Sequence, residues 1–292
     1  MDLAPTPERE ARRDMLRSFV AKEVRPKARD WDESGEFPAG TVARLGELGI
    51  LGAMVPEEYG GAGMDTVSYA IAVEEIGKGD GSLGLTVASH NSLCTAHILG
   101  FGSEEVKHRY LPDLASGKTL GAWALTEPGS GSDSIAMRTR ADRSGRNWVI
   151  NGTKMFITQG TVGDVFVVLA RTAPEKAQKG ITAFVLEKEM KGFSQRAIHG
   201  KLGMRSSDTA ELHMEDVEVP DENRIGEVDH GFLDTLAILD RGRVTIGADG
   251  DTKNHKGRTV DFNPKLAGLL AEMRKRRAPD SEWLFPSPQR GE

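Results

Sequence analysis

GAWALTEPGSGSD (residues 121–133) marks the point where the apolar pattern of this 292-residue chain changes from helical spacing to short strands. Its first five residues, Gly121 to Leu125, form an apolar run of strand length. The Thr-Glu-Pro and Gly/Ser residues that follow predict a loop, because proline fixes φ and glycine allows conformations closed to other residues. A strand that opens into such a loop presents N–H groups and hydroxyls to a phosphate or a flat heteroaromatic ring. The GxGxxG spacing of a dinucleotide-binding loop is absent, and most Gly/Ser-rich loops are only turns.

Short strands dominate the residues after this stretch. WVINGTKMFIT (148–158) predicts a tight hairpin, because Asn151-Gly152 is the dipeptide most typical of a two-residue turn. Gly, Pro, Asp and Asn clusters separate the predicted strands 121–126, 147–150, 153–158, 165–170, 181–186 and 210–219. Since no helical pattern intervenes, residues 119–228 predict an antiparallel β domain, either a barrel or a sandwich.

Helical patterns flank this β region. Residues 1–118 predict an all-α domain, with apolar residues at helical spacing and Thr66 as a helix N-cap. The pattern returns over 231–248, so residues 229–248 predict the first helix of an incomplete C-terminal domain. The predicted fold class is α+β: an N-terminal helical domain, an antiparallel β-barrel domain, one bundle helix and a short hairpin-plus-helix tail.

The tail, residues 249–292, differs in sequence pattern from the residues before it. A basic stretch over 252–260 predicts a hairpin, and Asn263 followed by Pro264 predicts the start of a helix. TKNHKGRTV and the later WLFP resemble a fragment of a tyrosine recombinase (phage integrase) catalytic domain. The tail has no tyrosine and no His-x-x-Arg box, so recombinase chemistry is not expected.

Composition excludes several classes of protein. The 38 Lys and Arg against 44 Asp and Glu give a net charge of −6, which does not favour binding to nucleic acid. No apolar run approaches the roughly 20 residues of a membrane helix, and the polar N-terminus is not typical of a signal peptide. Cys94 is the single cysteine and the histidines lack metal-ligand spacing, so no disulfide and no metal site are expected. A cytoplasmic location is predicted.

TEPGSGSD and NGTKMFIT together resemble the acyl-CoA dehydrogenase family. The resemblance continues in family order through VPEEYGGAGMD (55–65), LGMRSSDTAEL (202–212), DVEVPDENRIG (216–226) and GFLDTLAILDRGRVTIGA (231–248). It implies a flavoprotein in which FAD accepts a hydride from the β-carbon of an acyl-CoA thioester while a carboxylate removes the α-proton. It also implies an electron-transfer flavoprotein as redox partner and a homo-oligomer, whose interface would be truncated in this chain.

The resemblance implies roles for individual residues. The cofactor-binding residues would be Trp123, Ala124, Leu125, Thr126, Gly131, Ser132, Phe156, Ile157 and Thr158. Thr126 would bond the pyrimidine side of the flavin, Phe156 would lie along the ring, and Thr158 would place its hydroxyl near N5. The substrate-binding residues would be Ser132, Ser207, Asp240 and Arg243. Taken singly, such residues are more often ordinary core, turn or surface positions.

No catalytic base is assigned. Most relatives carry this glutamate in a C-terminal bundle that the chain is expected to lack, and a minority carry it at the position matching Gly242. Glu127 belongs to the turn and is not expected to replace it. Three functions therefore stay open: an acyl-CoA dehydrogenase-type flavoprotein with impaired turnover, a non-catalytic flavin or acyl-CoA binding module, and a DNA-interacting integrase-fragment fusion.

Overall fold

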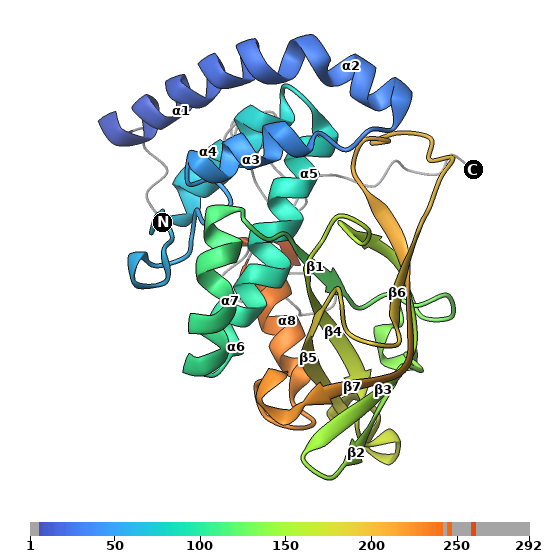
Figure 1. The fold of residues 1–292 in the computed structure, drawn as a ribbon. Helices are drawn as coiled ribbons and strands as arrows, with labels where there is room; N and C mark the ends of the chain where they lie inside the picture. The colour runs from blue at the N-terminus through green and yellow to red at the C-terminus, as the bar shows by residue number, and fades with distance from the viewer. Residues whose placement is uncertain (1–5, 242–243, 247–257, 261–292) are drawn as a thin grey trace, which may run out of the picture. The chain divides into compact units, whose positions relative to one another are not determined.

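The computed structural model describes residues 6–241, 244–246 and 258–260 (Figure 1). Residues Pro5–Arg241 form one compact unit, and Gly242–Glu292 with Met1–Ala4 form another. In the second unit, β9 (Val244–Ile246) pairs antiparallel with β10 (Arg258–Val260). The rest of the predicted hairpin over 252–260 and the whole predicted helix after Asn263 lie outside the described residues.

The N-terminal part of the large unit is helical, as predicted. Its helices are α1 (Pro7–Phe19), α2 (Arg25–Ser34), α3 (Ala39–Glu47), α4 (Thr66–Gly77), α5 (Gly81–Ser89), α6 (Ala96–Phe101) and α7 (Glu104–Ser116). Single π-helical turns, Val20–Val24 and His90–Thr95, connect α1 to α2 and α5 to α6. The cap of α4 is Asp65 and not Thr66, because the Asp65 carboxylate accepts the N–H groups of Val67 and Ser68. No helix in the described part of the chain has the length and apolar character to cross a membrane.

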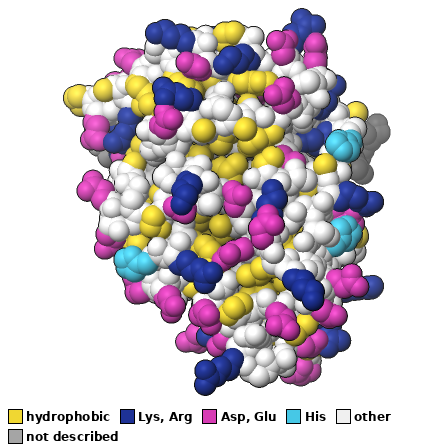
Figure 2. Space-filling model, viewed as in Figure 1, with side chains coloured by type: hydrophobic (Ala, Val, Ile, Leu, Met, Phe, Trp, Pro, Cys, Tyr) yellow, Lys and Arg dark blue, Asp and Glu magenta, His cyan; other side chains and the backbone are white. Residues whose placement is uncertain are grey.

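On the face that Figure 2 shows, Lys and Arg side chains are interspersed with Asp and Glu side chains. Many are paired along helices, for example Arg12 with Glu8 and Lys107 with Glu104. A surface of mixed sign does not concentrate the positive potential that nucleic acid requires.

The sheet is mixed and open, which corrects the predicted antiparallel barrel. Its strands are β1 (Gly121–Ala124), β2 (Arg140–Ser144), β3 (Asn147–Thr158), β4 (Val165–Arg171), β5 (Ile181–Glu187), β6 (Phe193–Ala197), β7 (Thr209–Pro220) and β8 (Arg224–Ile225). The order is β6-β7-β3-β2-β4-β5-β8, with β1 parallel to β4. A barrel needs both edges joined, but β8 has two residues and, among the described strands, pairs only with β5.

The predicted Asn151-Gly152 hairpin turn is also wrong. Both residues lie inside the continuous strand β3, and the β2–β3 turn is at Gly145 and Arg146. Glycine is needed at 152 for a close approach, because an added Cβ would lie 2.5 Å from the Thr139 Oγ1. Asn151 donates to the Asp216 carboxylate at 3.0 Å and accepts the Asp216 N–H at 2.9 Å. It therefore braces a bulge in β7 instead of forming a turn.

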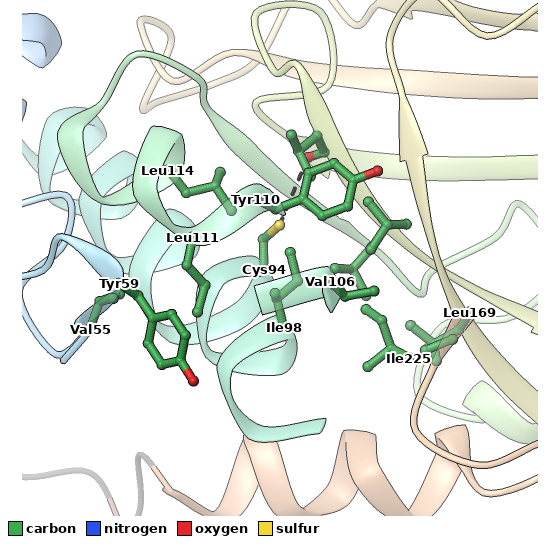
Figure 3. Close-up of a cluster of buried hydrophobic side chains, with 14 of the residues drawn as sticks. Val55, Tyr59, Cys94, Ile98, Val106, Tyr110, Leu111, Leu114, Leu169 and Ile225 are labelled. Atoms are coloured by element: carbon green, nitrogen blue, oxygen red, sulfur yellow. Dashed lines mark hydrogen bonds between the residues drawn. The ribbon is translucent and has the colours of Figure 1, made fainter. Parts of the chain in front are cut away.

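One hydrophobic core joins the helices to the sheet (Figure 3). Cys94 lies in it with Ile98, Leu111 and Leu114, and its thiol faces the Val165 carbonyl at 3.8 Å. Burial raises the pKa of the Cys94 thiol to about 12, so the thiol stays protonated and acts as part of the core packing. Strand β1 follows α7 directly and enters the sheet beside this core.

The helix after the sheet, α8 (Gly231–Arg241), is shorter than the predicted span 231–248. Val244–Ile246 is a strand, so the prediction that the helix continues to residue 248 is wrong. Valine and isoleucine lose side-chain freedom in a helix and favour strands. Helix α8 packs against α6 and β5, and Leu233 and Leu236 on it are exposed by 55% and 43%.

Candidate functional site

The segment 125–139 projects from the edge of the sheet between β1 and β2. Ala124 pairs with Val168 and Arg140 pairs with Arg171, so both ends of the segment meet the same edge of β4. These two positions on β4 are roughly 10 Å apart at strand spacing. A segment this long cannot lie flat in that interval, and it forms the loop that the sequence predicts.

Inside this loop, one residue anchors the backbone and its neighbours stay open. Ser130 is buried and exchanges two backbone hydrogen bonds with Glu127, at 2.9 and 3.1 Å. Gly129, Gly131 and Ser132 are exposed. A Cβ added at either glycine would meet no atom within 4 Å, so protein packing does not require glycine there. Close approach of a ligand to the backbone would require it.

Strand β3 presents an exposed aromatic ring in a strained conformation. Lys154 pairs with Leu212 and Ile157 with Ala210, so β3 carries one extra residue here and bulges. Phe156 lies in this bulge with φ 59° and is 61% exposed. A left-handed aromatic residue is rare and costs free energy. Burial of the ring in the chain does not offset that cost, so Phe156 is a functional candidate.

A backbone hydrogen bond places the two predicted cofactor-binding segments side by side. The Met155 N–H donates to the Thr126 carbonyl at 2.8 Å. Thr126 therefore lies beside the strand that carries Phe156 and Thr158, although β2 separates them in the chain. Threonine hydroxyls and free backbone positions next to an exposed ring suit a flat ligand with hydrogen-bonding groups on its edge.

The other predicted cofactor-binding residues are more enclosed. Trp123 is half-buried, and its indole N–H donates to His97 Nδ1 at 3.0 Å. Ala124 and Ile157 are buried, and the Leu125 carbonyl accepts a hydrogen bond from Lys154. The side chains of Ala124 and Ile157 belong to the core, so a ligand would meet them only through the backbone.

Beneath the loop lies a buried ion pair that the sequence analysis did not single out. Lys154 Nζ donates to Glu127 Oε1 at 2.8 Å and to the Leu125 carbonyl at 3.1 Å. Glu127 also accepts the N–H groups of Arg138 and Thr139, at 2.6 and 3.0 Å. The Lys154 side chain is fully buried and that of Glu127 is 5% exposed.

The strand pattern contained a signal for this pair. Trp148 and Ile150 point inward from β3, and Lys154 has the same parity in the sequence. A lysine at an inward position needs an acidic partner, because an unpaired buried charge is very costly. Strand propensity alone does not reveal this requirement.

The pKa values of Glu127 and Lys154 reflect both their burial and their pairing with each other. Burial would raise the pKa of Glu127, but the Lys154 charge and the hydrogen bonds to the carboxylate together lower it. Burial lowers the pKa of Lys154 to about 8, against the opposing effect of Glu127. Since both oxygens of Glu127 accept hydrogen bonds from the chain, this carboxylate is not available as a catalytic base.

Ser207 lies next to the β3 segment but is enclosed. Thr209 pairs with Thr158, which places Ser207 near the end of β3. Ser207 is 1% exposed, and its hydroxyl has no hydrogen-bond partner within the described residues. Its N–H donates to the Met204 carbonyl, and its carbonyl accepts from Lys201. A buried hydroxyl without a partner is where a ligand atom or an ordered water is expected.

The remaining predicted residues are less defined. Asp240 lies in the last turn of α8, but its side chain is not among those described. Arg243 and Gly242 lie outside the described residues. The predicted substrate-binding pair and the position matched to the base therefore stay predictions.

A groove of about 580 Å³ lies elsewhere, and none of the predicted residues lines it. Its walls include Ser103, Arg143, Asp221 and Arg224. Asp221 is paired with both arginines, and charges of both signs line the groove. Its chemistry does not point to a ligand class, so we place the candidate site at the loop and the β3 bulge.

Comparison with known proteins agrees with this fold. The acyl-CoA dehydrogenase N-terminal domain matches residues 6–118 and the acyl-CoA dehydrogenase middle domain matches residues 122–217. The short-chain-specific acyl-CoA dehydrogenase of Clostridium acetobutylicum is 43% identical over 288 residues, covering 94% of this chain and 76% of its own length. That coverage extends past residue 248, so similarity to dehydrogenases reaches further than the sequence motifs suggest.

Two solved structures share the architecture. Butyryl-CoA dehydrogenase from Megasphaera elsdenii has a TM-score of 0.79 and 37% identity, covering 82% of this chain and 64% of that chain. A glutaryl-CoA dehydrogenase from Mycobacterium smegmatis in complex with FADH2 has a TM-score of 0.76 and 36% identity, covering 81% and 59%. The chain thus spans about three fifths of the length of these solved relatives. With this fold, and with 43% identity to a relative of which it covers 76%, the chain belongs to the acyl-CoA dehydrogenase family.

Proposed function

We propose that this chain binds FAD, the cofactor of its family, between the loop after β1 and the bulge of β3. The observation that carries the proposal is Phe156, an exposed aromatic ring held in a left-handed conformation beside the Thr126 loop. The open backbone at Gly131 and Ser132 would face the acceptor-rich parts of the cofactor. Bound FAD would supply the hydride acceptor for oxidation of a substrate.

The predicted cofactor-binding residues would contact FAD in different ways. The hydroxyls of Thr126 and Thr158 would donate hydrogen bonds to the flavin edge, and Phe156 would cover part of the ring. Trp123, Ala124, Leu125 and Ile157 would act through their backbone, since they belong mostly to the core. These contacts bind and orient the cofactor but do not themselves remove a proton.

The substrate class that we propose is an acyl-CoA thioester, oxidised between Cα and Cβ. Ser132, Ser207, Asp240 and Arg243 would contact its CoA moiety. An electron-transfer flavoprotein as redox partner, a homo-oligomeric state and a cytoplasmic location follow from the same resemblance. The recombinase-like reading of residues 249–292 stays a separate prediction.

Catalytic turnover requires a general base, and no residue of the chain is assigned to that role. Glu127 is engaged by Lys154, Arg138 and Thr139. The resemblance places the base at the position matching Gly242 in a minority of relatives and in a C-terminal bundle in most. None of the described carboxylates is assigned as the base, and a reaction without a general base is slower by typically 10²–10⁴-fold. We therefore favour a flavin site with slow dehydrogenation, and a non-catalytic flavin or acyl-CoA binding module is the second candidate.

Flavin titration of the purified chain tests binding. Phe156→Ala should weaken FAD binding roughly tenfold, the value of an aromatic contact of about 1–1.5 kcal/mol. Leu233→Ala, which removes an exposed apolar side chain on α8, is the matched control and should leave affinity unchanged. Absence of FAD binding by the unsubstituted chain would refute the proposal.

A dye-reduction assay with butyryl-CoA and octanoyl-CoA then separates the two candidates. A measurable but slow rate supports the dehydrogenase, and binding without any reduction supports the binding module. A rate typical of characterised members of the family would show that another residue serves as the base.

A further inference from the structure

The buried ion pair Glu127–Lys154 has a desolvation cost that a gain in stability does not account for. Lys154 is among the largest fully buried side chains of the described residues. A buried ion pair is weak support for stability, because removing two charges from water offsets most of their attraction. Replacement by apolar residues of similar size is often neutral or stabilising. The pair therefore calls for a reason other than stability.

Its contacts show what it does to the backbone. Lys154 holds the start of the projecting loop through the Leu125 carbonyl, at 3.1 Å. Glu127 holds the end of the same loop through the N–H groups of Arg138 and Thr139. One ammonium and one carboxylate thus close the base of the whole segment 125–139.

The pair also sets the loop against strand β3. Lys154 lies two residues before Phe156 and at the edge of the bulge in β3. The next residue, Met155, donates its N–H to the Thr126 carbonyl at 2.8 Å. Rotation of Lys154 away from the loop would leave that single backbone bond to hold Thr126 beside Phe156 and Thr158.

We propose that Glu127 and Lys154 are positioning residues that hold the two halves of the flavin site at a fixed separation. They do not touch the cofactor. They act through Thr126 on one side and through Phe156 and Thr158 on the other. This inference rests on the proposed function, since the separation matters only if a flavin lies between these groups.

The alternative is an ion pair that only supports the fold. The double variant Glu127→Gln with Lys154→Met separates the two roles, because it removes both charges together and leaves none unpaired. If the pair positions the site, the flavin-free double variant keeps its cooperative unfolding while its Kd for FAD rises roughly 10–100-fold, as for lost supporting partners of other sites. The visible absorption and circular dichroism of bound flavin should change as well.

Two further variants complete the experiment. Glu127→Gln alone keeps the shape of the side chain and should raise the Kd less than the double variant does. Glu75→Gln is the matched control: Glu75 is also buried and ion-paired, with Arg17 and Lys78, but lies in α4. It should change stability and leave FAD affinity and the flavin spectrum unchanged.

Each outcome decides between the roles. Wild-type affinity and flavin spectrum in a folded double variant, or in Glu127→Gln if the double variant does not fold, overturn the positioning role and leave the proposed function intact. An unsubstituted chain that binds no FAD overturns the proposed function and this inference together. Amide hydrogen exchange in the flavin-free protein tests the Met155–Thr126 hydrogen bond directly. The Met155 N–H should exchange faster in the variants than in the unsubstituted chain. An unchanged exchange rate contradicts the inference.

Discussion

Acidification should destabilise this protein through His90. Its Nδ1 accepts the N–H of Gly121, the first residue of β1, at 3.0 Å, and its Nε2 lies 3.1 Å from the Leu114 carbonyl in α7. A carbonyl can only accept, so Nε2 carries the hydrogen and Nδ1 is bare. Protonation of Nδ1 would place an N–H against the Gly121 N–H and break the junction between α7 and β1.

The magnitude follows from burial. His90 is fully buried, which lowers its pKa from the ordinary 6.5 to about 4 despite its hydrogen bonds. The unfolded chain therefore binds more protons than the folded chain between these values, and stability falls as the pH falls through this window. The separation corresponds to roughly 3 kcal/mol, fully present above pH 6.5 and lost by about pH 4.

Urea denaturation followed by circular dichroism between pH 7.5 and 4 measures this loss. His90→Gln can accept from Gly121 and donate to Leu114 without titrating, so its stability should depend less on pH than that of the unsubstituted chain. His199→Gln, at an exposed position, is the control and should keep the original dependence. Parallel pH profiles for His90→Gln and the unsubstituted protein would refute the reasoning.

Four further changes have defined outcomes. Gly152→Ala should destabilise the fold by about 1–3 kcal/mol in urea denaturation, because its Cβ would collide with Thr139; a cost below about 0.5 kcal/mol contradicts this. Gly131→Ala should change stability by less than about 0.5 kcal/mol, since no atom lies within 4 Å, and lowered FAD affinity with unchanged stability would support ligand approach there. Gly242→Glu should increase dye reduction with acyl-CoA, and unchanged activity in a flavin-loaded variant counts against that position for the base. Leu236→Ser should reduce self-association in sedimentation if the exposed face of α8 drives it; a protein that is already monomeric excludes that cause.

The secondary structure of the core could be predicted because it depends on local pattern. The strands 165–170 and 181–186 agree with β4 and β5 to within a residue, since continuous apolar runs leave little alternative. The region before Thr119 is helical as predicted, because its apolar residues recur at helical spacing. Strands β2, β6 and β8 were missed, because they are short and partly exposed and have no apolar run.

The candidate site was proposed from the sequence only as two separate segments. The residues 123–132 and 156–158 could be named from the resemblance, but their adjacency depends on the Met155–Thr126 hydrogen bond. The ion pair Glu127–Lys154 was missed, since the inward parity of Lys154 signals that it needs an acidic partner but not that the partner is Glu127. The Asn151-Gly152 prediction failed because local turn propensity cannot report the approach of Thr139, which fixes glycine in the middle of β3.

By itself, the sequence determined the succession of a helical region and a β region, the family, and the two segments that we propose to bind a flavin. These are properties of local periodicity and of ordered motifs, which do not depend on distant contacts. The tertiary structure decided the open mixed sheet, the left-handed Phe156 in its bulge, and the buried pair that joins loop to strand. Each of these depends on which distant backbone comes within a few ångströms, a constraint that exists only after the chain has packed.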